Sequence, residues 1–308
     1  FVLLGIYGCS NKSEDVQVFS GDALGTTYQV KFFSSEERDI SESIDSIFEV
    51  INSSMSTYRE DSDISRINAG DSTIVVDEHF REVFNASKKI YEESKKMFDP
   101  TVGKLVNTYG FGPEGPKTVI DEKQLDSLRN FIGFDKLTIT RDGRILKQDP
   151  GIYIDFNAIA KGYAVDVIAG FLDQNSIENF LVEIGGELVA RGTNVERGES
   201  WAVGIDDPQQ EEGKRELQAA VKLENRAMAT SGNYRKFRTD PETGRSYVHT
   251  INPVTGLAEE SDLLSVSVLA ENCTLADGYA TAFMALGYQG GLEMLERISN
   301  VDVYFIYL

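Results

Sequence analysis

Residues 152–166 read IYIDFNAIAKGYAVD, and the spacing of apolar side chains changes within this stretch. Up to Phe156 the apolar residues alternate with others, which predicts a β-strand. From about Asn157 to Leu172 they recur every three or four positions, which predicts a helix. The rest of the chain is therefore expected to be organised around a strand-to-helix junction near its middle.

The predicted junction carries Asp155, Asn157 and, four residues into the helix, Lys161. A helix N-terminus presents unpaired N–H groups and the positive end of the helix dipole, an arrangement that suits a phosphate. The same residues also fit an ordinary junction in which Asn157 caps the helix and Lys161 is solvated. The stretch by itself does not separate these two interpretations.

The composition limits the possible partners of the chain. Its 308 residues can form one large domain or two small ones, and a formal net charge of -20 argues against nucleic acid as a partner. An anionic ligand would therefore need a local cation. With only two histidines and two cysteines, a Cys/His zinc site is nearly excluded, so a bound metal is expected to be a hard cation held by oxygen ligands.

The N-terminus resembles the end of a bacterial lipoprotein signal peptide. Residues 1–9 read FVLLGIYGC, a short apolar run with a small residue before Cys9, and a polar stretch follows. We expect Cys9 to carry the lipid, residues 1–16 to be a signal remnant and tether, and residues 17–308 to form the domain. The alternative is the start of a buried strand. No other apolar run reaches about 18 residues, so no membrane-spanning helix is expected.

The order of predicted elements indicates an α+β fold. Alternation or hairpin signals predict strands within 16–33, 137–147, 179–191, 201–205, 217–223, 263–270 and 301–308. Helical spacing predicts helices at 40–55, 77–98, 121–132, 274–286 and 292–298, with Ser62 capping a short additional helix and Gly287 separating the last two. The pair Gly185-Gly186 is either a bulge or a close approach of the backbone to a ligand.

A second stretch with chemical potential is ADGYATA, residues 276–282. Asp277 and Thr281 are four positions apart, so their oxygens share one helix face. A carboxylate and a hydroxyl could occupy two positions on Mg²⁺ and leave others for a carbonyl, waters and phosphate oxygens. The alternative is an acidic residue complementing the helix dipole and a threonine facing the core.

The two histidines receive different interpretations. His249 lies in YVHTINP, at the end of a predicted strand, and could accept a proton near neutral pH or serve only in packing. His79, in an acidic helix start, is assigned to a structural role. Cys273 is expected to be an unpaired core residue.

Taken together, these segments resemble the ApbE family, the FAD:protein FMN transferases. The similarity runs in order over nearly all of the chain after the tether. The matching segments lie at 25–28, 55–68, 98–103, 110–113, 154–166, 185–187, 230–232, 249–256 and 276–281.

The resemblance implies a single two-lobed α+β domain with mixed or antiparallel sheets, flanking helices, and FAD between the lobes. It also implies Mg²⁺-dependent transfer of FMN from FAD to a Thr or Ser hydroxyl of a flavoprotein, such as a redox-pump subunit, with release of AMP. Family members are typically lipoproteins or periplasmic, which agrees with a lipid on Cys9 and a periplasm-facing location in the bacterial cell envelope.

Residue by residue, the resemblance implies three Mg²⁺ ligands: Asp277, Thr281 and the backbone carbonyl of Ala158. It implies a catalytic role for His249, which we expect to accept the proton of the incoming hydroxyl. The FAD contacts that it implies are Leu24, Tyr58, Asp99, Pro100, Thr101, Asp155, Lys161 and Ile251. The family often has Gly or Ser where Asn157 and Ala158 stand, but a carbonyl ligand requires no particular side chain.

The sequence is also compatible with two alternative functions. The first is a Mg²⁺-dependent FAD pyrophosphatase that gives FMN and AMP, with water in place of the protein hydroxyl. The second is a non-catalytic FAD-binding lipoprotein, which would need neither His249 nor the pair Asp277 and Thr281. A purely structural lipoprotein would leave the ordered motifs unexplained.

Overall fold

The computed structural model describes residues 14–113, 122–211, 213–232, 237–239, 246–248, 250–258 and 262–308. Cys9 and His249 lie outside the described residues. Within those residues, no helix combines the length and the apolar character needed to cross a bilayer.

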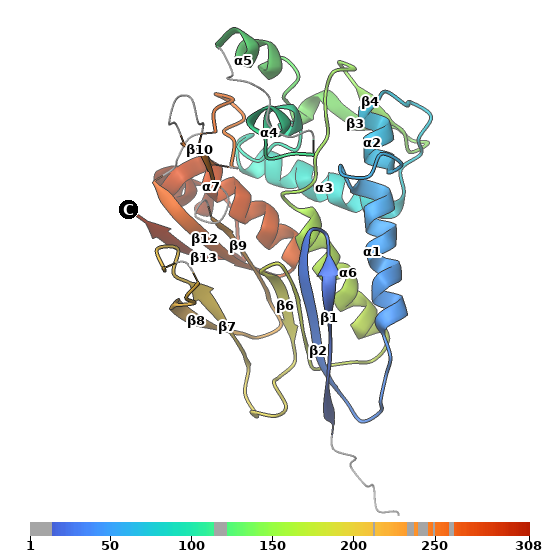
Figure 1. Ribbon diagram of the computed structural model, residues 1–308, viewed down its shortest axis with the longest axis vertical. Helices are drawn as coiled ribbons and strands as arrows, with labels where there is room; N and C mark the ends of the chain where they lie inside the picture. Colours follow the sequence, from blue (N-terminus) through green and yellow to red (C-terminus); the bar gives the residue numbers. More distant parts are fainter. Residues whose placement is uncertain are drawn as a thin grey trace, which may run out of the picture.

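A seven-stranded sheet in the order β1-β2-β5-β6-β9-β12-β13 forms the base of the described structure (Figure 1). Each neighbouring pair is antiparallel. The strands are β1 (Asp15–Ala23), β2 (Thr26–Ser34), β5 (Phe180–Ile184), β6 (Glu187–Arg191), β9 (Ala227–Gly232), β12 (Leu263–Ala270) and β13 (Asp302–Tyr307). The predicted α+β fold with antiparallel sheets is confirmed, although β1 begins two residues inside the segment predicted to be a tether.

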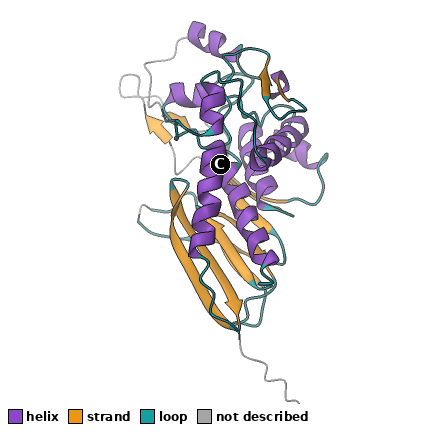
Figure 2. Ribbon diagram, turned by 90° about the vertical axis from the view of Figure 1, so that its right-hand side faces the viewer, coloured by secondary structure: helices purple, strands orange, loops and turns teal. Residues whose placement is uncertain are grey.

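Helices cover one face of this sheet (Figure 2). They are α1 (Ser41–Met55), α6 (Ala160–Gln174) and α7 (Cys273–Leu295). α6 packs on β5, β6 and α7, while α7 packs on β9 and β12. The opposite face is covered in part by the hairpin β7 (Trp201–Asp206) and β8 (Leu217–Leu223), whose Trp201 and Ile205 pack with Phe33 and Leu188.

The remaining helices, the short strand pairs and long loops lie above the sheet in Figure 1. They are α2 (Asp63–Asn68), α3 (Glu78–Glu93), α4 (Gly103–Tyr109), α5 (Glu122–Arg129), η1 (Phe134–Lys136), and the pairs β3 (Leu137–Ile139) with β4 (Ile145–Lys147) and β10 (Phe237–Thr239) with β11 (Ser246–Val248). The predicted Ser62 cap of α2 is confirmed, because Ser62 Oγ accepts from the Ser65 amide at 3.2 Å. A small cluster of Leu105, Tyr109, Leu125, Ile251 and Ala258 is separate from the main core.

The central stretch differs from its prediction. Residues 152–156 form no sheet strand, and their regular pairing consists of one parallel bridge between Tyr153 and Val102. The alternation is real, with Ile152 and Ile154 buried, but side chains and loops satisfy the backbone instead of a neighbouring strand. The helix begins at Ala160 and not near Asn157, so Lys161 is its second residue.

Other elements also differ from their predictions. Residues 179–191 form two strands, because Gly185 and Gly186 both adopt positive φ (62° and 107°) and reverse the chain. α3 ends at Glu93 and not at Phe98, and α4 was not predicted. α7 continues to Leu295 through a break at Gly287 (φ 71°, ψ 178°), which confirms that this glycine interrupts the helix.

Candidate functional site

The first group of functional side chains gathers where α6 meets α7 and β6. We call Lys161, Gly162, Glu187 and Asp277 the helix cluster. Lys161 Nζ lies 2.5 Å from Glu187 Oε2, and the Gly162 amide donates to Asp277 Oδ2 at 2.9 Å. Glu187 and Asp277 are 3% and 4% exposed, so this group brings two buried carboxylates to one lysine.

Close packing of the two helices places Asp277 beside the start of α6. A Cβ on Gly162 would lie 2.3 Å from the Cys273 carbonyl oxygen and 2.7 Å from Asp277 Cβ. Only a glycine permits this approach, which explains its place after Lys161. In one of the two interpretations of this stretch, the helix start offers its amides to a phosphate, but the Gly162 amide is bonded to Asp277.

Asp166 fixes the start of α7 against α6. Its carboxylate accepts from the Cys273 amide at 2.8 Å and from the Thr274 amide at 2.7 Å, while the Thr274 hydroxyl donates to it as well at 2.5 Å. These bonds satisfy N–H groups in the first turn of α7. They hold the helix that carries Asp277 in register with the helix that carries Lys161.

A second group, which we call the loop cluster, consists of Asp99, Pro100, Thr101 and Asp155. Asp99 Oδ1 accepts from the Thr101 amide at 2.8 Å and from its hydroxyl at 2.6 Å. The Asp155 amide donates to the Pro100 carbonyl at 2.8 Å. The structure therefore joins two segments that are more than fifty positions apart in the sequence.

The loop cluster is tied to α2 and to the loop before it. The Asn68 side chain donates to the Ile154 carbonyl and accepts from the Ile154 amide, both at 2.8 Å. Asn157 Nδ2 donates to Thr57 Oγ1 at 3.2 Å. Tyr58, which follows Thr57 in the chain, is 63% exposed, so its ring has an open surface for a flat ligand.

Burial raises the pKa of carboxylates in both clusters. It raises the pKa of Asp99 and that of Asp155 to about 6 in each case. Burial, reinforced by the nearby Glu187, raises the pKa of Asp277 to about 7. Burial opposes the Lys161 ammonium, but the neighbouring Glu187 and Asp277 carboxylates raise its pKa above the usual value. Partial burial and then the charge of Asp155 raise the pKa of Tyr58.

The other residues predicted for the site lie on different elements. Leu24 is in the β1–β2 turn with φ 51°, an uncommon conformation for a branched side chain, and packs against the main core. Ile251 is 5% exposed within the small cluster, so its side chain serves packing. Ala158 lies in the turn before α6, and Thr281 lies one turn beyond Asp277 on α7. Their predicted FAD and Mg²⁺ contacts stay predictions, as does the role of His249.

No role was predicted from the sequence for Glu187, Asn68 or Asp166. Glu187 was visible only as the residue after a glycine pair in a matching segment. Asn68 and Asp166 act through hydrogen bonds to residues 86 and 107 positions away. Spacing along the chain carries no signal for such contacts.

The residues present fit Mg²⁺ in part. Asp277 and Thr281 supply side-chain oxygens, Ala158 supplies a carbonyl, and hard cations prefer oxygen ligands. Two buried carboxylates share one lysine there, and a bound cation would favour the ionised form of Asp277, which burial disfavours. The described residues contain no group of three or more His, Cys, Asp or Glu side chains suited to hold a metal, so these three ligands would need waters or phosphate oxygens to complete the shell.

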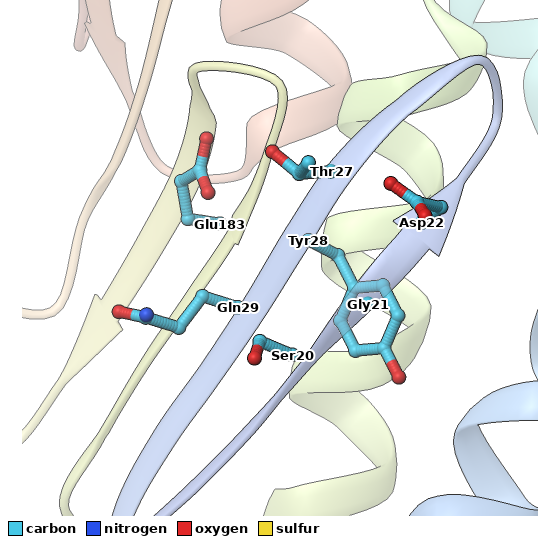
Figure 3. A pocket seen from close by; sticks show the side chains of 7 residues that line it. All are labelled: Ser20, Gly21, Asp22, Thr27, Tyr28, Gln29 and Glu183. Atoms are coloured by element: carbon cyan, nitrogen blue, oxygen red, sulfur yellow. The ribbon is translucent and has the colours of Figure 1, made fainter.

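A hollow of about 380 Å³ lies on β1 and β2 next to Glu183 of β5 (Figure 3). Its lining includes Ser20, Asp22, Thr27 and Gln29, and none of the predicted site residues. Glu183 Oε1 accepts from the Gly186 amide at 2.6 Å, so the hollow borders the turn that leads to Glu187.

The fold and the two clusters define an α+β protein that has helices on an antiparallel sheet, a buried carboxylate–lysine site and a polar loop cluster. Comparison with known proteins gives the family. The model of the ApbE family matches residues 24–305, and the chain belongs to this family.

The chain is similar to proteins named FAD:protein FMN transferase. The relative from Vibrio cholerae is 36% identical over 302 residues, covering 96% of this chain and 88% of its own length. The relative from Haemophilus influenzae is 34% identical, covering 98% of this chain and 89% of its own length. The structure resembles the flavin transferase ApbE from Vibrio cholerae (TM-score 0.83, 34% identity, 96% and 94% of the two chains). It also resembles the apo form of the flavinyl transferase ApbE from Pseudomonas stutzeri (TM-score 0.85, 32% identity, 96% and 92%).

Proposed function

We propose that this chain is an FAD:protein FMN transferase that joins FMN from FAD to a Thr or Ser hydroxyl of a target flavoprotein, with Mg²⁺ bound and AMP as the leaving group. The observation that carries the transferase activity is the family match over residues 24–305, together with relatives of that name along nearly the whole chain. The flavoprotein acceptor follows from this activity, and a redox-pump subunit is the acceptor we propose.

The reaction exchanges the phosphoanhydride bond of FAD for a phosphoester bond to the acceptor. The acceptor oxygen bonds to the phosphorus of the FMN half, and the bond between this phosphorus and the bridging oxygen breaks. AMP leaves with the bridging oxygen and its electron pair. The proton of the acceptor hydroxyl passes to a base, for which we propose His249.

Described residues supply binding and orientation. Bound Mg²⁺, held by Asp277, Thr281 and the Ala158 carbonyl, would neutralise charge on the phosphate oxygens. Lys161 lies beside Asp277 and carries a positive charge suited to a phosphate oxygen. Tyr58 offers an exposed ring beside Asp155 for stacking on a flat part of FAD.

For the cellular location we propose a lipid on Cys9 that anchors the chain to a membrane of the bacterial envelope, facing the periplasm. The motif in residues 1–9 supports this proposal. Labelling with a radioactive fatty acid, compared between the wild type and Cys9→Ala, tests it. Label in the wild type alone is the expected result.

The transferase proposal is tested by incubating the protein with FAD and Mg²⁺, with and without a flavin-acceptor fragment, and resolving AMP, free FMN and protein-bound flavin. We expect covalent flavin on the acceptor, lost in Asp277→Ala and retained in Glu199→Gln, which changes an exposed residue paired with Lys222. Free FMN and AMP without acceptor would make the protein a pyrophosphatase. FAD that binds and stays intact would leave only a carrier.

A further inference from the structure

Glu187 occupies a position that the backbone fixes closely. It is the first residue of β6, directly after the turn in which Gly185 and Gly186 both have positive φ. The Gly185 amide donates to the Thr27 carbonyl at 3.0 Å, and the Gly186 amide donates to the Glu183 carboxylate at 2.6 Å. Both turn amides are therefore anchored, and the Glu187 carboxylate reaches Lys161 of α6.

The charges around Lys161 do not balance. The Lys161 ammonium lies 2.5 Å from the Glu187 carboxylate. It is also close enough to Asp277 for the Asp277 carboxylate to raise the pKa of Lys161. A buried ion pair needs only one partner of each sign. The carboxylate of Asp166 is bonded to the first residues of α7 and is also close to the charge of Arg191. Glu187 and Asp277 are therefore the two carboxylates that share the Lys161 ammonium.

This imbalance has a consequence for an anionic substrate. Without a divalent cation, Glu187 neutralises Lys161 and Asp277 adds no positive charge, so the site has no net attraction for a pyrophosphate. With a divalent cation beside Asp277, the same groups carry a net positive charge, and the Lys161 ammonium can turn toward a phosphate oxygen. Lys161 is 30% exposed, so its ammonium is not sealed from the solvent side of the site.

We infer that Glu187 is a positioning residue that makes capture of the FAD pyrophosphate by Lys161 depend on the divalent cation. The carboxylate holds the ammonium while the cation is absent and strengthens the negative field that draws the cation to Asp277. Removal of its charge should therefore move the affinities for the two ligands in opposite directions. This inference rests on the proposed FAD-dependent function.

The test is Glu187→Gln, which removes the charge and keeps the side-chain volume. FAD binding is measured by flavin fluorescence in EDTA, where no cation supports turnover, and Mg²⁺ binding is measured by the rise in Tm without FAD. We expect FAD to bind about tenfold more tightly in EDTA and Mg²⁺ to bind about tenfold more weakly, a factor equivalent to about 1.4 kcal/mol in each case. Glu199→Gln, which removes one exposed charge, should change neither affinity.

Two further variants separate this role from a structural one. Glu187→Asp retains the charge and should keep FAD binding in EDTA weak, as in the wild type. In a Lys161→Met background, Glu187→Gln should no longer tighten FAD binding but should still weaken Mg²⁺ binding. Weaker binding of both ligands by Glu187→Gln, or tighter FAD binding that persists without Lys161, would overturn the inference while FMN transfer by the wild type stands. A wild type that binds no FAD under either condition would overturn the inference and the proposed function together.

Discussion

The helix cluster and the loop cluster both bury carboxylates, yet different forces hold them. In the helix cluster, Lys161, Glu187 and Asp277 come from α6, β6 and α7. These elements are far apart in the chain, and the Lys161 ammonium pairs with the Glu187 carboxylate across them. In the loop cluster, Asp99 is satisfied by its neighbour Thr101, and Asp155 by the nearby Asn157 amide. The first cluster therefore depends on the packing of charged side chains from rigid elements, whereas in the second each carboxylate accepts hydrogen bonds from residues close to it in the chain.

The difference indicates a division of labour. A cluster with unbalanced charge on packed helices is suited to a cation and to the phosphates it neutralises. A cluster with satisfied carboxylates on loops beside the exposed Tyr58 is suited to recognise the less charged parts of a ligand. Changes in one cluster should therefore leave the properties of the other largely intact.

The largest effect is expected from Gly162→Ala. The added Cβ would meet the Cys273 carbonyl and Asp277 Cβ, so α6 and α7 must separate. We expect the free energy of unfolding to fall by about 2–3 kcal/mol and FMN transfer to fall roughly 100-fold, as overpacking and a small misplacement typically cause. Urea unfolding and the acceptor assay measure the two effects. Unchanged transfer would show that helix contact does not position Asp277.

Asn68→Ala should break the loop cluster alone. The change removes two hydrogen bonds to the Ile154 backbone and should cost about 2 kcal/mol of stability. We expect the KM for FAD to rise about tenfold, while the Mg²⁺ concentration for half-maximal rate stays unchanged. A parallel rise in both constants would contradict the separation of the two clusters.

The loop cluster also predicts a pH dependence of stability. Burial raises the pKa of Asp155 from 3.8 to about 6, so the folded protein binds the proton more tightly than the unfolded chain does. Protonation of Asp155 therefore stabilises the fold at low pH, and this contribution is lost as the pH rises from about 4 to about 6.

Asp155→Asn should make the free energy of unfolding depend less on pH in this range. Because Asn does not titrate, the free energy of unfolding of the wild type should fall by on the order of 2 kcal/mol relative to that of the variant between pH 4 and pH 6. Chemical unfolding at both pH values, in the absence of FAD and divalent cations, measures the difference. A constant difference would mean that Asp155 keeps an ordinary pKa in the folded protein.

The smallest effect is expected from Gly170→Ala on the same helix as Gly162. No atom lies within 4 Å of the added Cβ, so the better helix propensity of alanine should stabilise the protein by up to about 1 kcal/mol. FMN transfer should not change. A loss of stability comparable to that of Gly162→Ala would show that helix glycines in general, and not the contact with α7, are required.

Residue types and spacing predicted much of the architecture. The hairpin of β1 and β2, the helices α1 and α7, and the break at Gly287 agree with their predicted positions, because hydrophobic period and glycine conformation act locally. The family could be predicted as well, since its segments follow one another along the chain and the family model matches residues 24–305.

The tertiary structure decided the contacts between distant segments. Alternating apolar residues at 152–156 predict a strand, but Asn68 and Pro100 satisfy part of that backbone, and no sheet forms there. The pairing of Glu187 with Lys161 depends on a chain reversal at two glycines and on the packing of α6 against β6. Local sequence determines which elements form, whereas the balance of buried charge depends on which elements fold against one another.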